Sequence, residues 1–207
     1  MTTAVHATNP CLHAIVIGAG PEGLACAEVL GLRLERVTLI ERHDIPDHGA
    51  PGDTACPARP AAALRRVLDA PRVVVRPGLE VVALVLCPDR VRGVAVRPRR
   101  GGAREPVTIL ADLVVDATGW RHDRLVGLPD GLVVVAGPGD GGAVDGQVGR
   151  DQVASRAVVT ASALGRCLDH HLARRAGLCG FSAVAQRAVA GAAHDLPAPV
   201  PVPTPAT

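Results

Sequence analysis

The 207-residue sequence predicts an α/β domain, with a parallel sheet, flanking helices on both sides of it and a small antiparallel β-meander. Its apolar segments are short uninterrupted runs, which are typical of parallel strands buried on both faces. Early in the chain these runs alternate with a helical pattern, as parallel strand connections require. Farther on, two apolar runs are separated by a short Pro-Asp turn, which indicates an antiparallel hairpin.

The first predicted elements form a strand–helix–strand unit. The apolar run over 14–17 ends at a glycine and predicts a buried strand. Pro21 suits the first turn of a helix and Glu22 favours the positive end of its dipole, so a helix is expected over 21–34. A second strand is expected over 37–40, where a Glu-Arg pair ends the run. The spacing fits a βαβ unit.

The remaining elements follow from the same patterns. In chain order they are a loop over 44–57, a helix over 59–68, a strand over 73–75, a hairpin of 81–86 and 91–96, strands over 107–110, 113–115 and 132–136, and helices over 152–175 and 178–193. We expect residues 13–194 to form one domain. Residues 1–12 form a flexible N-terminal arm, and residues 195–207 form a Pro-rich disordered tail because proline alternates there with small residues.

Composition excludes several classes of function. A net charge of +2, with one Phe, one Trp and no Tyr, predicts no nucleic-acid partner. No apolar run reaches the roughly 18 residues of a membrane span, and no signal-peptide pattern opens the chain, so we expect a cytoplasmic protein with no membrane partner. The six cysteines form no C-x-x-C pair and no acid–histidine cluster stands out, so no metal site is predicted. No catalytic side chain can be named.

The clearest motif follows the first predicted strand, where six residues fit G-x-G-x-x-G. Gly18 allows a tight turn, Gly20 lacks the Cβ that would keep a pyrophosphate away, and Gly23 lets the helix lie close to the strand. The diphosphate would then sit at the N-terminus of the helix, where N–H groups and the dipole favour negative charge. The alternative is a glycine-rich turn that binds nothing. The predicted cofactor-binding residues of this turn are Gly18, Ala19, Gly20, Pro21, Glu22 and Gly23.

An acidic residue supports the dinucleotide interpretation. Glu41 lies at the end of the second predicted strand, roughly 20 residues after the motif, where a carboxylate can accept both ribose hydroxyls of an adenosine. Its charge disfavours a 2′-phosphate, so NADP is a poor candidate for this first site. The alternative for Glu41 is a solvated acid at a strand end. The motif predicts a Rossmann-type domain but does not choose between NAD and FAD.

Later stretches resemble a known superfamily. "VTLIERH", "ARPAAALRRVL", "VVVRPGLEVVALVLCPDRVRGVAVRPR" and "LADLVVDATGWRHD" are similar, in this order, to segments of the FAD-dependent monooxygenase and oxidoreductase superfamily, in particular its hydroxylase and epoxidase-like members. The resemblance covers about residues 13–172. It implies the FAD/NAD(P)-binding fold with FAD as cofactor. NAD(P)H is the candidate electron donor, although no second glycine-rich motif would bind it.

The resemblance adds residues to the candidate site. It implies that Arg42 and Arg59 flank the phosphates and that the backbone of Val82, in a meander strand, contacts the adenine. It also implies that a tight turn of Ala117, Thr118 and Gly119 lies beside the cofactor and that Asp140 contacts the ribityl chain. The alternatives are a solvated helix arginine for Arg59 and a plain loop acid for Asp140.

One departure from the superfamily limits the expected function. Its members carry a substrate domain between the positions that match Gly119 and Asp140, whereas this chain has only a short segment there. Without that cover, an isoalloxazine would face water. We therefore expect an FAD-binding oxidoreductase of the monooxygenase type, in an active or a catalytically degenerate form, with an unknown small-molecule substrate. A separate chain could supply the substrate domain. The alternatives are a non-catalytic truncated flavoprotein remnant or partner module, and a small NAD-binding protein.

Overall fold

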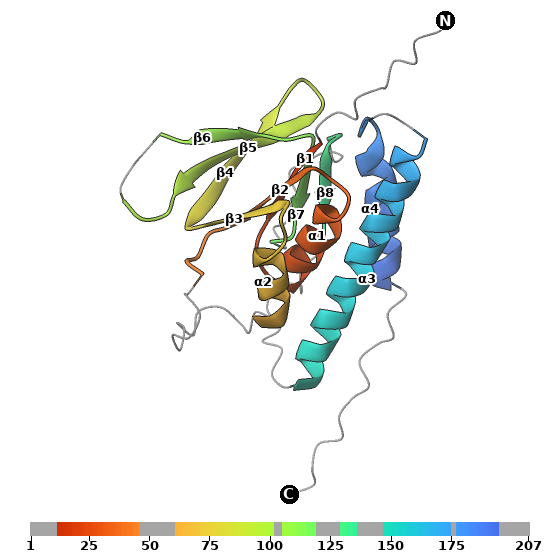
Figure 1. Cartoon of the computed structure of the whole chain (residues 1–207). Coiled ribbons are helices and arrows are strands. Elements are labelled where there is room, and N and C mark those ends of the chain that lie inside the picture. Colours follow the sequence, from red (N-terminus) through yellow and green to blue (C-terminus); the bar gives the residue numbers. More distant parts are fainter. Residues whose placement is uncertain are drawn as a thin grey trace, which may run out of the picture.

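A five-stranded parallel sheet forms the centre of the protein (Figure 1). The computed structural model describes residues 12–45, 61–101, 105–118, 129–135, 147–174 and 177–194. The sheet has the order β3-β2-β1-β7-β8, and every neighbouring pair is parallel. Its strands are β1 (His13–Ile17), β2 (Arg36–Glu41), β3 (Val73–Pro77), β7 (Leu113–Asp116) and β8 (Leu132–Val134). The order reverses at β1, because β2 and β3 lie on one side of it and the later strands β7 and β8 on the other.

The predicted meander is a separate antiparallel sheet. It has the order β4-β5-β6, with strands β4 (Leu79–Leu86), β5 (Val91–Pro98) and β6 (Val107–Leu110). The hairpin between β4 and β5 is closed by the N–H of Cys87, which donates to the carbonyl of Arg90 at 2.9 Å. The prediction of a hairpin turned at the Pro-Asp pair is therefore confirmed.

Four helices complete the described part of the chain: α1 (Pro21–Gly31), α2 (Ala61–Leu68), α3 (Gln147–Leu172) and α4 (Phe181–His194). The hydrophobic residues of all four pack in one cluster on one face of the parallel sheet, whereas the meander packs on the other face (Figure 1). The parallel sheet with flanking helices is confirmed. The expectation of helices on both sides is wrong for the described residues, because the meander supplies the second covering layer.

The alternation along β1 shows this division. Ala14 and Val16 belong to the cluster on the helical side, whereas Ile15 and Ile17 belong to the cluster on the meander side. All four side chains are buried. A strand buried on both faces must be apolar at every position, which explains the uninterrupted run in the sequence.

The edge of the parallel sheet at β8 is covered by a side chain of α4. The N–H of Val134 donates to Oε1 of Gln186 at 2.8 Å, and Nε2 of Gln186 donates to the carbonyl of Val134 at 3.0 Å. One turn earlier on α4, Oγ of Ser182 accepts from the N–H of Gly131 at 3.2 Å and donates to Oδ1 of Asp130 at 2.7 Å. These side chains bind the backbone groups that an adjacent strand would otherwise pair.

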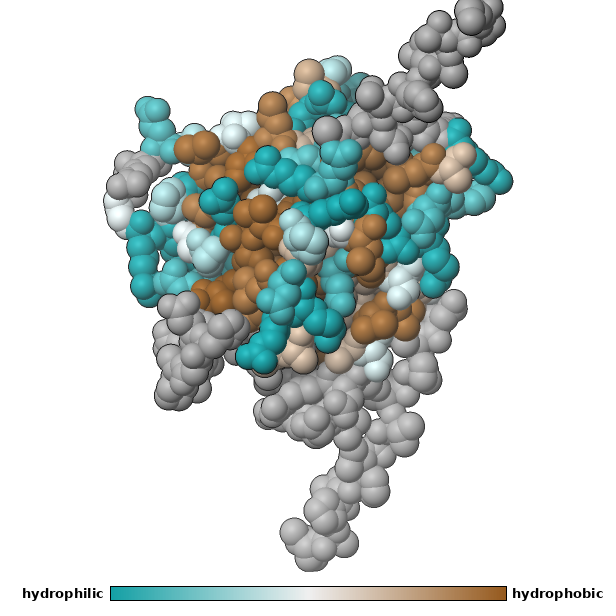
Figure 2. Space-filling model, viewed as in Figure 1, coloured by the Kyte–Doolittle hydropathy of each residue, from teal (hydrophilic) through white to brown (hydrophobic). Residues whose placement is uncertain are grey.

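The surface is mixed in character. Figure 2 shows apolar side chains gathered over the meander, where Leu86, Val107 and Leu110 are exposed, next to polar side chains. None of the described helices, the 26-residue α3 included, combines the length and the apolar character of a bilayer span. The predicted arm up to residue 11 and the predicted tail over 195–207 lie outside the described residues.

Candidate functional site

The glycine turn lies at the carboxyl ends of the parallel strands, next to the point where the strand order reverses. The N–H of Gly18 donates to the carbonyl of Ile40 at 2.8 Å, and the N–H of Ala117 donates to the carbonyl of Ile17 at 3.0 Å. These bonds bring the turn after β1 beside the turn after β7. In open α/β sheets, ligands bind in the crevice at this topological switch point.

The fold itself requires two of the three motif glycines. Gly18 has φ +94°, a backbone conformation that disfavours side chains. A Cβ on Gly23 would lie 1.8 Å from the carbonyl oxygen of Gly18, so any side chain there would push α1 off the turn. Both predicted roles, the tight turn and the close helix–strand approach, are confirmed.

Gly20 is different, because neither its backbone nor its packing requires a glycine. It has φ −69° and ψ 179°, which any residue adopts. Among the described residues, the nearest atom to a Cβ at this position is Oε2 of Glu22, 4.0 Å away. Gly20 is also the N-cap of α1, and no side chain caps the helix there. The described residues therefore leave room over Gly20 at a helix N-terminus, as the approach of a diphosphate would need.

Glu41 reaches the glycine turn from the end of β2. Its side chain is buried, with 5% of the residue exposed. Oε2 accepts a hydrogen bond from the N–H of Ala19 at 2.8 Å, and Oε1 accepts one from the N–H of His43 at 2.9 Å. The Nδ1 atom of His43 lies 3.0 Å from the same Oε1. The structure thus brings Glu41 to the motif, but the N–H of Ala19 already has an acceptor.

The burial of Glu22 is the least expected feature of the turn. Only 2% of this residue is exposed, although it lies in the first turn of α1. Among the described residues, Oε1 of its carboxylate has no hydrogen-bond partner. Burial raises the pKa of this carboxyl, and the backbone N–H of Glu22 and the positive charge of Arg156 on α3 oppose the rise. The sequence predicts a favourable dipole interaction here but gives no sign of burial.

A third buried carboxylate, that of Asp116, holds the residues after β7. Oδ1 of Asp116 accepts from the N–H of Thr118 at 2.8 Å and from its Oγ1 at 2.6 Å, and Asp116 is 3% exposed. Ala117 is buried and Thr118 is exposed, whereas the third residue of the predicted turn, Gly119, lies outside the described residues. Sequence reasoning did not assign Asp116 to the site. The signal was its place directly before the Ala-Thr-Gly turn.

The other predicted site residues are less closely connected to the motif. Arg42 follows Glu41 and is exposed. Val82 lies in β4 at a bulge, where the register with β5 skips it and its backbone is left out of the ladder. The predictions for Arg59, Gly119 and Asp140 lie outside the described residues. Within the ranges that the structure describes, no three His, Cys, Asp or Glu side chains are grouped to hold a metal ion.

No protein-family model matches the chain, and no curated protein matches it. Among solved structures, the chain is similar to THI4 of Thermovibrio ammonificans, with 21% identity over 52% of this chain and 57% of that one and a TM-score of 0.42. It is also similar to the myxobacterial chondrochloren halogenase CndH, an FAD-dependent halogenase, with 22% identity over 52% and 37% and a TM-score of 0.40. It is similar as well to a thioredoxin reductase from Gloeobacter violaceus, with 21% identity over 51% of this chain and 28% of that one and a TM-score of 0.39. The chain thus spans 28–57% of the length of these three proteins.

Proposed function

We propose that this chain binds FAD at the glycine turn and is a flavoprotein oxidoreductase of the FAD-dependent monooxygenase type. The observation that carries the proposal is the space over Gly20. The fold accounts for Gly18 and Gly23, whereas the glycine at position 20 is accounted for by a ligand that must approach the backbone.

Different residues of the chain would bind different parts of the cofactor. The diphosphate would lie over Gly20 at the N-terminus of α1, where N–H groups without intrahelical acceptors point outward. Glu41 would accept hydrogen bonds from the ribose, because its carboxylate lies at the end of β2 and reaches the N–H of Ala19 in the glycine turn. The bulge at Val82 would offer backbone groups to the adenine.

The choice of FAD over NAD rests on the resemblance of residues 13–172, because Gly20 and Glu41 suit either dinucleotide. When bound, FAD would supply the redox chemistry. No described side chain is assigned as a catalytic acid or base. We further propose that a separate chain supplies the cover over the flavin ring, because the segment between Gly119 and Asp140 is too short to form one.

A pair of glycine variants tests the proposal. The purified protein is incubated with FAD over a range of concentrations, free FAD is removed by ultrafiltration, and the flavin retained by the protein is measured by its absorbance at about 450 nm. Gly20→Val should weaken FAD binding by about tenfold or more and lower the melting temperature by no more than about 4 °C, because no described atom lies closer than 4.0 Å to the new Cβ and valine is only a poorer N-cap residue. The matched control is Gly191→Val, since a Cβ on Gly191 of α4 meets nothing within 4 Å.

Each alternative has its own outcome. Equal FAD affinity of wild type and Gly20→Val would refute binding at this turn. Thermal stabilisation by NAD but not by FAD would identify a small NAD-binding protein. Stabilisation by neither dinucleotide would identify a non-catalytic remnant or partner module.

A further inference from the structure

The carboxylate of Glu22 lies where an anionic ligand of α1 would lie. Its Oε2 is 4.0 Å from the place of a Cβ on Gly20, so this oxygen lies beside the glycine turn. The backbone N–H of Glu22, in the first turn of the helix, favours the charged form of the same carboxylate and so lowers its pKa. The carboxylate therefore lies near the helix N-terminus, where a phosphate binds in a dinucleotide site.

No described donor reaches the other oxygen of this group. Oε1 of Glu22 is buried without a hydrogen bond to any described residue, and only 2% of Glu22 is exposed. A buried carboxylate oxygen without a donor is unfavourable, and burial accordingly raises the pKa of the carboxyl. The dipole at the uncapped N-terminus of the helix favours the charged form and opposes the effect of burial.

The charged and titratable groups near Glu22 do not remove the repulsion between its carboxylate and a phosphate. From α3, Arg156 acts on Glu22 through its positive charge, but no described donor reaches Oε1. On α1 itself, burial raises the pKa of the Cys26 thiol to about 12, so this neighbour stays neutral. A second carboxylate, that of Glu41, holds the N–H of Ala19 in the same turn. Two acidic side chains thus use backbone donors of a turn that would bind a diphosphate.

We propose that Glu22 is an internal competitor for the diphosphate position at the N-terminus of α1, and that a dinucleotide binds there only when this carboxylate moves away or is neutralised. The inference rests on the proposed function, because it assumes that the turn is a dinucleotide site. Two like charges in a space shielded from water repel each other strongly. Glu22 therefore sets the affinity for the phosphate part of the ligand and not for its base or sugar.

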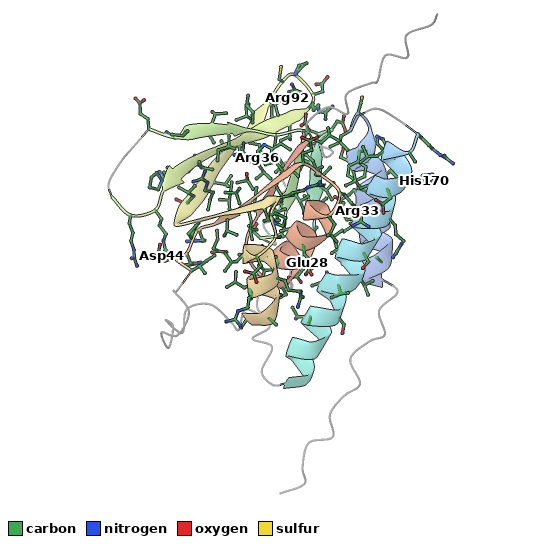
Figure 3. The ribbon with its side chains drawn as sticks, in the orientation of Figure 1. Glu28, Arg33, Arg36, Asp44, Arg92 and His170 are labelled. Atoms are coloured by element: carbon green, nitrogen blue, oxygen red, sulfur yellow. The ribbon has the colours of Figure 1, made fainter. Side chains whose placement is uncertain are left out.

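The test compares charge removal at two positions of α1. Glu22→Gln keeps the shape of the side chain and removes its charge, and Glu22→Ala removes the whole carboxylate. The control is Glu28→Gln, which makes the same charge change farther along the helix. Glu28, labelled in Figure 3, lies on α1, and its Oε1 accepts from Nε of Arg66 on α2 at 2.8 Å. Binding of FAD, ADP and adenosine is measured by calorimetry, and folding is checked by thermal unfolding.

Both Glu22 variants should bind FAD and ADP about tenfold or more tightly than wild type, whereas Glu28→Gln should change these affinities by less than about twofold. Adenosine, which has no phosphate, should bind all variants equally. The melting temperature of Glu22→Gln should not fall, since the substitution removes an unfavourable buried charge.

Two results would overturn the inference and are distinguishable from failure of the proposed function. If wild type binds FAD and the Glu22 variants bind it no more tightly, Glu22 does not compete and the proposed function stands. If adenosine gains as much affinity as ADP, the effect does not act through the phosphates. If neither wild type nor any variant binds FAD or ADP, the proposed function itself is wrong and the inference fails with it.

Discussion

Replacing Gln186 by methionine should measure how much the covering of the β8 edge stabilises the fold. The Gln186 amide makes two hydrogen bonds with Val134, at 2.8 and 3.0 Å, and both residues are half-buried. Methionine has the same unbranched length and a similar helix propensity. Gln186→Met therefore removes the two hydrogen bonds while keeping most of the packing.

The expected magnitude follows from the number of bonds. Each hydrogen bond contributes about 0.5–1.5 kcal/mol net, so two correspond to about 2 kcal/mol of unfolding free energy. The backbone groups of Val134 are only half-buried, so water can reach them and little further penalty is added. For a chain of this size, about 2 kcal/mol lowers the melting temperature by about 4–8 °C.

Urea denaturation and thermal unfolding, both followed by circular dichroism, give the two quantities. Arg187→Ala is the matched control, because Arg187 is the next residue of α4 and is exposed. Its unfolding free energy should stay within about 0.5 kcal/mol of wild type. A melting temperature for Gln186→Met within about 1 °C of wild type would refute the argument that the amide replaces a neighbouring strand at this edge.

Two further variants test the packing of the turn and a half-buried histidine. Gly23→Ala should lower the unfolding free energy in urea by about 3 kcal/mol, because its Cβ would lie 1.8 Å from the carbonyl oxygen of Gly18, and unchanged stability would contradict the close helix–strand contact. In the folded chain, Nδ1 of His13 lies 2.8 Å from the carbonyl of Leu110 and Nε2 lies 2.9 Å from Oγ1 of Thr38, and burial lowers the pKa of the imidazole. The unfolded chain then takes up the proton first, so the stability of wild type relative to His13→Gln should fall as the pH is lowered through 6.5, as unfolding free energies on both sides of that pH would reveal. A difference between the two proteins that does not change with pH would count against this assignment.

The strands and their types are predictable because their signals are local. The apolar run over 14–17 and the Pro-Asp turn before Val91 each determine a nearby piece of backbone, and both agree with the structure. The layer on each face of the sheet is not predictable in this way. Every position of β1 from Ala14 to Ile17 is apolar, which indicates that both faces of the strand are buried. The pattern does not indicate whether a helix or a sheet covers each face.

Among the site residues too, the features set by contacts between adjacent segments are predictable and those set by distant contacts are not. The roles of Gly18 and Gly23 depend on contacts between adjacent segments, so the motif spacing predicts them. The burial of Glu22 depends on its packing in the fold, including its proximity to Arg156 of α3, and the pairing of Val134 with Gln186 depends on the docking of α4. Side-chain partners that far apart in the sequence are determined by tertiary packing, for which a single sequence carries no pattern.

The parallel sheet also acts as a partition between two interiors. Leu24 of α1 belongs to the interior on one side and Val94 of β5 to the interior on the other. A void made by truncating Leu24 can be refilled only by enlarging a residue on the helical side, because the strand backbones do not yield to let a side chain through. Repacking therefore proceeds independently in the two interiors, and paired substitutions should show coupling within a layer and additivity across the sheet.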